Sequence, residues 1–305
     1  MDCKILVLGA GGLGCEMLKD LAMCNVREIH VVDMDTIELT NLNRQFLFRE
    51  SDIGKPKAQV AADYINNWSK KRRELNSGAK RVLAVSYVQD LTSFEPEFFK
   101  QFAFVISGLD AIEPRRFVNE TLVNITRNTG YSVCIPFIDG GTEGYKGHVK
   151  TIVPGITACW ECSIDTLPSQ QHTYPMCTIA NNPRTTEHVI EYALTVQFPN
   201  ADLDNPNDVN KLLDFSRTRA HEFGIDQTDL TASYLLGIAK NIIPSVSTTN
   251  AMIAAACCER ATAIYYDLVD IETMDTFTIF NGSNGFFSHS FQYQRNPDCL
   301  VCGGL

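Results

Sequence analysis

The start of the chain carries the feature that most constrains its fold: an apolar segment, a glycine-rich turn and an amphipathic segment in direct succession. Lys4–Leu8 has the apolar character of a buried strand, and it leads into Gly9-Ala10-Gly11-Gly12-Leu13-Gly14. Leu13–Met23 then carries apolar residues at helical spacing, and Ile29–Val32 forms a second candidate strand that ends on Asp33. This order predicts a βαβ unit, and therefore a parallel sheet with a right-handed crossover.

The turn from Gly9 to Gly14 predicts a nucleotide site. Glycines allow a tight turn and a close approach of phosphate, while the start of the following helix offers unpaired N–H groups. Asp33 follows 19 residues after Gly14, where an acid can bind a ribose hydroxyl. The glycine pattern alone is weak evidence, and a purely structural turn is the alternative. The flanking strand, helix and acid favour phosphate binding.

Two later segments indicate which nucleotide binds. Asn41-Leu42-Asn43-Arg44-Gln45-Phe46 and Gly54-Lys55-Pro56-Lys57 bring the cations Arg44 and Lys57 and the amide of Asn41 to the same region of the fold. A dinucleotide pyrophosphate needs little beyond backbone amides, whereas a triphosphate undergoing displacement needs cations around its charge. We therefore predict ATP, with a nicotinamide dinucleotide as the alternative; plain surface positions are the alternative for the two cations.

Asp110 is the predicted magnesium ligand. It follows the apolar segment Phe104-Val105-Ile106 and the tripeptide Ser107-Gly108-Leu109. Ligands of open α/β sheets lie at the carboxyl ends of the strands, and one carboxylate beside substrate phosphates is a common way of holding Mg²⁺. A helix N-cap is the alternative role for this residue.

The remaining sequence predicts a doubly wound α/β domain with an insertion. We expect residues 1–168 to form the first part of this domain and residues 238–305 its remainder, with the polar, helical stretch 169–237 inserted between them. Gly140–Pro154 carries the glycines of a β-hairpin. The further elements expected are helices at Lys57–Trp68, Pro114–Thr129 and Pro244–Tyr266 and strands near Arg81–Val85, Ser132–Ile138, Thr276–Phe280 and Phe286–Tyr293.

Composition argues against several classes of protein. The formal net charge is −10, a value at odds with the basic surface of nucleic-acid-binding proteins. No apolar run approaches the roughly 20 residues that cross a bilayer. The start Met1-Asp2-Cys3-Lys4 has no basic segment of the kind that opens a secretion signal. We therefore expect a globular protein of the cytoplasm and nucleus, with no nucleic-acid or membrane partner.

Eleven cysteines in such a chain indicate reduced thiols that bind metal or take part in catalysis rather than disulfides. Four of them form two C-x-x-C pairs separated by 137 residues. Four thiolates in two such pairs suit a tetrahedral, structural Zn²⁺ with no open coordination position. A single pair also serves redox chemistry, but neither pair stands at the start of a helix in a thioredoxin-like unit. We predict a zinc site that ties the C-terminal segment to the nucleotide-binding domain, on Cys159, Cys162, Cys299 and Cys302.

Together these motifs resemble the activating enzymes of ubiquitin-like modifiers and their bacterial relatives in molybdopterin and thiamin biosynthesis. The resemblance covers nearly the whole chain and rests on the glycine turn, Asp33-x-Asp35, Asn41–Phe48, Lys55-Pro56-Lys57 and Gly108-Leu109-Asp110. It implies a Rossmann-like adenylation domain in which ATP-Mg²⁺ reacts with the C-terminal carboxylate of a small protein modifier. The implied nucleotide-binding residues are Gly9, Gly11, Gly12, Gly14, Asp33, Asp35, Asn41, Arg44 and Lys57, with Asp110 on Mg²⁺ and the four paired cysteines on structural Zn²⁺.

The segment Pro175-Met176-Cys177-Thr178-Ile179 resembles the catalytic-cysteine segment of the same enzymes. The resemblance implies that the thiol of Cys177 attacks the acyl adenylate and holds the modifier as a thioester. Cys177 lies just ahead of a predicted helix, whose N-terminus would lower the pKa of a thiol. Thr178 is a further candidate, for polar assistance at the thioester or as an N-cap. Considered without the family, a single cysteine in a polar segment is more simply incidental.

Within this family, Ile138–Gly144 and Pro154–Cys159 are most similar to the enzymes that act on modifiers of the Rub/Nedd type, and the SUMO branch is the alternative. The resemblance implies three protein partners: the modifier, a conjugating enzyme that receives it, and a pseudo-symmetric regulatory subunit that completes a heterodimer. Two other classes of function stay open on the sequence, a nucleotide-binding scaffold without chemistry and a nicotinamide oxidoreductase.

Overall fold

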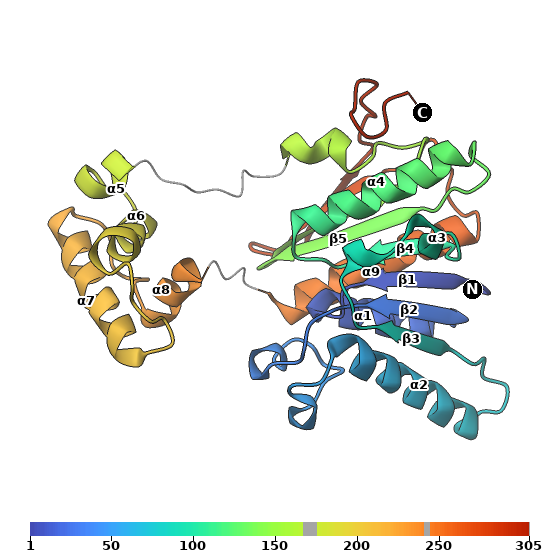
Figure 1. Cartoon of the computed structure of the whole chain (residues 1–305), viewed down its shortest axis with the longest axis horizontal. Helices are drawn as coiled ribbons and strands as arrows, with labels where there is room; N and C mark the ends of the chain where they lie inside the picture. The colour runs from blue at the N-terminus through green and yellow to red at the C-terminus, as the bar shows by residue number, and fades with distance from the viewer. Residues whose placement is uncertain (167–175, 241–244, 305) are drawn as a thin grey trace. The chain divides into compact units, whose positions relative to one another are not determined.

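The computed structural model describes residues 1–166, 176–240 and 245–304, and the chain folds into two compact units. The first unit combines Met1–Leu167 with Ser245–Leu305, and the second is Pro168–Pro244 (Figure 1). The expected insertion, 169–237, falls inside the second unit. None of the helices in the described ranges has the length and hydropathy of a membrane span.

A mixed sheet forms the centre of the first unit, and its described strands lie in the order β3-β2-β1-β4-β5-β6-β7-β8. The strands from β3 to β5 in this order pair in parallel, whereas β6, β7 and β8 extend the sheet by antiparallel pairing. The predicted α/β class with a doubly wound parallel part is confirmed. The strand bounds are Lys4–Leu8 (β1), Glu28–Val32 (β2), Leu83–Tyr87 (β3), Phe104–Ser107 (β4), Phe137–Glu143 (β5), Lys146–Ile152 (β6), Phe277–Asn281 (β7) and Phe287–Phe291 (β8).

Helices cover both faces of this sheet. The helices α1 (Gly12–Met23), α2 (Lys57–Leu75) and α9 (Ser247–Tyr265) share one apolar core with the sheet, and α3 (Pro96–Phe99) and α4 (Ile112–Asn128) share the other. Side chains of a strand alternate between the faces of a sheet. The residues of β1 follow this rule, since Ile5 and Val7 lie in the first core and Leu6 and Leu8 in the second.

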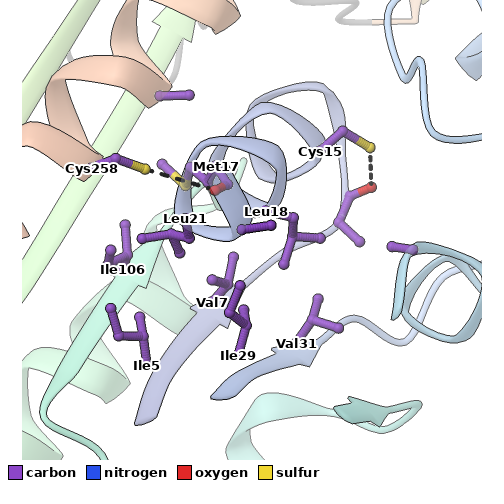
Figure 2. Packing of buried hydrophobic residues seen from close by; sticks show 14 of the residues in the cluster. Ile5, Val7, Cys15, Met17, Leu18, Leu21, Ile29, Val31, Ile106 and Cys258 are labelled. Carbon is purple, nitrogen blue, oxygen red and sulfur yellow. Dashed lines mark hydrogen bonds between the residues drawn. The ribbon is translucent and has the colours of Figure 1, made fainter. Parts of the chain in front are cut away.

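The first core combines segments that precede the second unit in the sequence with segments that follow it. Figure 2 shows Ile5, Val7 and Ile29 of the sheet beneath Leu18 and Leu21 of α1. In the same view Cys258, on α9, donates its thiol to the backbone carbonyl of Met17 at 3.7 Å. The helix α9 is therefore an integral part of the first unit, although about 240 residues separate the two contacting positions.

The strand expected near Ser132–Ile138 lies further along the chain, at β5, and that prediction was wrong. The hairpin expected within Gly140–Pro154 is confirmed, because β5 and β6 pair in antiparallel fashion, but Gly140 and Gly141 themselves lie within β5. A Cβ on Gly140 would come 2.9 Å from the sulfur of Cys257, and one on Gly141 would come 2.3 Å from the ring of His148. These glycines therefore serve close packing inside a strand. The turn between β5 and β6 lies at Gly144, where φ is +56°.

Other elements match in kind and differ in their bounds. The helix α2 continues to Leu75, beyond the expected end at Trp68. The prediction stopped early because the last two turns are polar and mostly exposed and carry no apolar periodicity. The strand β3 begins at Leu83 rather than Arg81, since its pairing with β2 starts there.

The second unit is helical. Its small core contains Val189, Ile190, Leu212 and Leu235, all nearly inaccessible to solvent. Three of its helices begin with side chains that accept backbone N–H groups, namely Thr185, Asn205 and Thr231, which are favoured N-cap residues. The described elements are α5 (Met176–Asn181), α6 (Thr186–Tyr192), η5 (Ala193–Gln197), α7 (Pro206–Glu222) and α8 (Ala232–Ala239).

Candidate active site and metal centre

The glycine turn lies where the carboxyl ends of β1 and β2 meet. The N–H of Gly9 donates to the carbonyl of Val32 at 2.9 Å. Gly9 has φ of +92°, a conformation that favours glycine. A Cβ on Gly14 would lie 2.0 Å from the carbonyl oxygen of Gly9. Both ends of the turn therefore require glycine, one for its backbone conformation and the other for space.

Asp33 is held directly beside this turn. One carboxylate oxygen accepts the N–H of Ala10 at 2.6 Å, and the other accepts the N–H of Asp35 at 2.8 Å. Burial raises the pKa of the Asp33 carboxyl, although both N–H donors and the charge of Lys57 oppose the shift. The acid that the sequence assigns to a ribose thus lies within hydrogen-bonding distance of the glycine turn.

The two predicted cations lie in the same region. The ammonium of Lys57 is 2.8 Å from a carboxylate oxygen of Asp35, and only 11% of the Lys57 side chain is exposed. Arg44 is half-buried, and its alkyl chain lies 3.6 Å from the position that a Cβ on Gly12 would take. Its guanidinium donates to the carbonyl of Thr40 at 2.9 Å. The structure therefore brings both cations to the surroundings of the turn.

The predicted amide Asn41 has a local role in this structure. It is buried, and its side-chain oxygen accepts the N–H of Glu38 at 3.0 Å. This hydrogen bond belongs to a capping box around η1 (Leu39–Asn41). The contact fixes the orientation of the segment that continues to Arg44.

Two further polar side chains at the turn received no role from the sequence. Gln45 is buried, its amide nitrogen lies 4.0 Å from a Cβ position on Gly11, and its oxygen has no protein partner within the described ranges. Asn250, on α9, is also buried and would meet a Cβ on Gly12 at 2.4 Å. Gln45 lies within Asn41–Phe46, the segment that also carries Arg44. Asn250 had no local signal, because only the tertiary fold brings α9 to the turn.

Asp110 lies in the loop that follows β4. This loop is next to the turn, because the N–H of Gly108 donates to the carbonyl of Leu8 at 2.9 Å. Asp110 is exposed, and no hydrogen-bond donor meets its carboxylate in the part of the chain that the structure describes. The N-cap of α4 is Ala111, so the alternative role as a helix cap was wrong. Asp110 is accessible to a ligand at the carboxyl end of the sheet.

An ion pair between Arg115 and Asp139 holds this loop in place. Asp139 is fully buried and accepts the Nε–H of Arg115 at 3.0 Å. Burial favours the protonated acid, but the Arg115 guanidinium, the nearby His148 ring and a hydrogen bond from Ser107 hold the pKa of Asp139 well below its usual range. Arg115 also donates to the backbone carbonyl of Leu109. The sequence assigned no role to either residue, since they are 24 positions apart and match no known spacing.

The four paired cysteines form one cluster, and their sulfur atoms all lie within 4.8 Å of one another. The sulfur of Cys159 is 3.8 Å from that of Cys162 and 3.6 Å from that of Cys299, and Cys162 is 3.4 Å from Cys302. These separations are too long for disulfides, whose S–S bond is about 2.05 Å. They suit a tetrahedron with Zn–S bonds of about 2.3 Å. The N–H of Asn296 donates to the Cys162 sulfur at 3.5 Å, so the donor set and its surroundings fit Zn²⁺.

Cys177 and Thr178 lie in the second unit, as the second and third residues of α5. Their side chains are outside the described residues. Their assignment to thioester chemistry stays a prediction.

The doubly wound sheet carries a glycine turn with an acid and cations beside it. This arrangement defines a class of nucleotide-binding protein, and comparison with family models identifies the family. Residues 1–301 match the model of the ThiF family, so the chain belongs to the ThiF family. The chain is 61% identical over 303 residues to the NEDD8-activating enzyme E1 catalytic subunit of Saccharomyces cerevisiae, which covers 99% of this chain and 98% of that protein. The protein with the same description in Dictyostelium discoideum is 42% identical over 318 residues, covering 99% of this chain and 69% of that protein.

A relative from the alternative branch is less similar. SUMO-activating enzyme subunit 2 of Dictyostelium discoideum is 38% identical over 224 residues, covering 72% of this chain and 31% of that protein. Among solved structures, Escherichia coli MccB with ATP has a TM-score of 0.60 at 18% identity, covering 99% of this chain and 66% of that chain. That likeness supports the fold alone. The resemblance to the activating enzymes is confirmed by the sequence relatives.

Proposed function

We propose that this chain is the catalytic subunit of an enzyme that activates a ubiquitin-like modifier of the NEDD8 type. The observation that carries the proposal is the glycine turn with Asp33 and the Asp35–Lys57 pair held beside it, an arrangement suited to ATP. The modifier class comes from the relatives, which are catalytic subunits of NEDD8-activating enzymes. A pseudo-symmetric regulatory subunit and a conjugating enzyme are the further partners of this proposal.

In the first step, a C-terminal carboxylate oxygen of the modifier attacks the α-phosphorus of ATP. The bond from that phosphorus to the oxygen bridging to the β-phosphorus breaks, and pyrophosphate leaves, so the product is an acyl adenylate. The backbone N–H groups of Gly11 and Gly12 meet phosphate oxygens, Asp33 binds the ribose, and Arg44 and Lys57 neutralise the charge that develops on the leaving group.

Asp35 and Asn41 complete the nucleotide site. The carboxylate of Asp35 keeps the ammonium of Lys57 beside the turn, and Asn41 holds the segment that leads to Arg44. Asp110 would hold Mg²⁺, which supplies positive charge to the leaving pyrophosphate when it is bound.

In the second step, the thiolate of Cys177 attacks the carbonyl carbon of the acyl adenylate. The bond between that carbon and the phosphate oxygen breaks and AMP leaves, and the proton that the thiol lost on forming the thiolate has already passed to solvent. Thr178 assists at the thioester through its hydroxyl group. A cysteine thiolate of the conjugating enzyme then accepts the acyl group by exchange. The zinc site on the four paired cysteines takes no part in these steps and stabilises the fold.

The test combines the chain, its regulatory subunit, ATP-Mg²⁺ and labelled NEDD8, and separates the products on a non-reducing gel. We expect a reductant-sensitive adduct on the chain and ATP–pyrophosphate exchange that depends on the modifier. Cys177→Ala should lose the adduct and keep the exchange, whereas Cys24→Ala, which changes an exposed cysteine of the first unit, should keep both.

An adduct that survives Cys177→Ala would overturn the assignment of the nucleophile. Absence of exchange with any modifier would overturn the activating function itself. Faster adduct formation with SUMO or ubiquitin than with NEDD8 would overturn the modifier class.

A further inference from the structure

The helix that carries Cys177 is too short to be stable by itself. The helix α5 has six residues, Met176–Asn181, and isolated helices below about 12 residues are marginal in water. The last four carbonyl groups of any α-helix have no partner within the helix. Ile179 packs into the second unit, with 2% of its surface exposed. The position of α5 therefore depends on contacts from the rest of this unit.

Arg219, on α7, makes such a contact. Its guanidinium nitrogen Nη2 donates to the carbonyl of Ile179 at 3.0 Å and to the carbonyl of Ala180 at 2.6 Å. These are two of the four carbonyl groups that α5 leaves without a helical partner. A cation at the carboxyl end of a helix also interacts favourably with the partial negative charge there.

The guanidinium of Arg219 is itself held in place by aromatic rings. Its central carbon lies 3.8 Å from the ring centroid of Tyr192 and 5.0 Å from that of Phe223. Tyr192 in turn stacks on Phe215, with ring centroids 6.4 Å apart. A planar guanidinium that stacks and donates at once loses both interactions if it swings away. Arg219 is therefore a rigid link between α7 and the end of α5.

We propose that Arg219 is a positioning residue for Cys177, because it anchors the carboxyl end of the helix on whose first turn Cys177 stands. The inference rests on the proposed thioester function. Ile179 is only two residues from Cys177, so movement of the anchored end moves the backbone of the nucleophile as well. Small misplacements of a reacting group cost large factors in rate. Adenylation draws on residues of the first unit and does not use Arg219.

The chain contains a matched control for this residue. Arg217 lies two residues earlier on the same helix, and its Nε and Nη2 donate to the carbonyl of Leu230 at 3.3 and 3.0 Å. Arg217 thus also caps a backbone carbonyl of the second unit, but that carbonyl is outside α5.

The experiment uses the full chain with its regulatory subunit, ATP-Mg²⁺ and NEDD8, in the variants Arg219→Met, Arg219→Lys and Arg217→Met. Single-turnover thioester formation and ATP–pyrophosphate exchange are measured side by side, and amide hydrogen exchange is followed in the peptide 176–184. For Arg219→Met we expect a thioester rate lower by roughly 10- to 100-fold, wild-type pyrophosphate exchange and faster amide exchange in that peptide.

Arg219→Lys should recover part of the rate, since lysine keeps one cationic donor and loses the stacked plane. Arg217→Met should match the wild type in all three measurements. A folded Arg219→Met variant with the wild-type thioester rate would overturn the inference, and so would a parallel loss of pyrophosphate exchange. If Arg219→Met unfolds the second unit, a wild-type rate for folded Arg219→Lys overturns it and a reduced rate supports it. Failure of the wild-type enzyme to form the adduct would instead count against the proposed function.

Discussion

Trp160 donates its indole N–H to the buried carboxylate of Asp139 at 3.2 Å, and this contact links the cysteine cluster to the nucleotide end of the sheet. Trp160 stands between the two cysteines of the first C-x-x-C pair. Asp139 also accepts from Arg115, which donates to the carbonyl of Leu109 beside Asp110. A single carboxylate is thus shared by the cysteine cluster and the loop of the predicted magnesium ligand.

This shared carboxylate should be important for stability. Asp139→Asn leaves the mostly buried side chain of Arg115 without its counter-charge, and removal of one partner of a buried pair costs about 3–5 kcal/mol. Urea unfolding measures the loss. Asp208→Asn is the control, because Asp208 pairs with Lys211 on the surface, where solvent screens the attraction between the two charges. Similar losses in the free energy of unfolding for both variants would show that the buried pair contributes no more to stability than the surface pair.

Zinc should be measurable through Trp160. The chain has two tryptophans, and Trp68→Phe leaves Trp160 as the single tryptophan. We expect about one zinc per chain, and a chelator should change the Trp160 emission as the metal leaves. Cys299→Ser should lose the zinc, while Cys134→Ser, at a half-buried cysteine outside the cluster, should retain it. Elemental analysis of both variants decides the matter, and a zinc-free wild type would rule the site out.

Two glycines should respond to alanine in opposite directions. Gly14→Ala places a methyl group 2.0 Å from the Gly9 carbonyl oxygen, so the turn must open, and we expect weaker ATP binding and a loss of roughly 1–3 kcal/mol, as for overpacking. Gly237, within α8, has no neighbour within 4 Å of its Cβ position. Gly237→Ala should therefore stabilise by roughly 0.5–1 kcal/mol. Calorimetric unfolding gives the sign of the stability change for each variant, and ATP titration gives the affinity. Stability changes of the same sign in both variants would contradict the prediction.

His30 should add a pH-dependent component to stability. Burial lowers the pKa of its imidazolium, and Glu28 at 2.7 Å opposes the shift only in part. The unfolded chain then binds this proton more readily, so stability is complete above the unfolded pKa of about 6.5 and falls as the pH drops through the folded value. Unfolding by urea at several pH values below neutrality should show a shallower slope for His30→Gln. The exposed His221→Gln should keep the wild-type slope, and an unchanged slope in His30→Gln would contradict the prediction.

The sequence predicts best what depends on neighbouring residues or on residue chemistry. The first βαβ unit follows from local periodicity around Gly9–Gly14, and the cluster of Cys159 with Cys299 follows from the coordination chemistry of thiolates. The bounds of β5 were missed because Gly140 signals a turn locally, while its actual constraint is the distant sulfur of Cys257.

The supports of the site were invisible for the same reason. Arg115 and Asp139 become partners only when α4 packs on the sheet, and Asn250 reaches the turn only through α9. Arg219 looked like one of many charges on a polar helix. Its two carbonyl partners in α5 depend on the packing of the second unit, which no local pattern encodes.

The pairing of β6 with β7 has a consequence for biosynthesis. The residues of the second unit separate these strands in the chain, so a ribosome delivers all of Pro168–Pro244 before β7 is made. During that interval β6 has an open edge, and open edges invite pairing with other chains. The helical unit is synthesised while the nucleotide-binding unit is unfinished, and translation that stalls within this stretch leaves an aggregation-prone nascent chain.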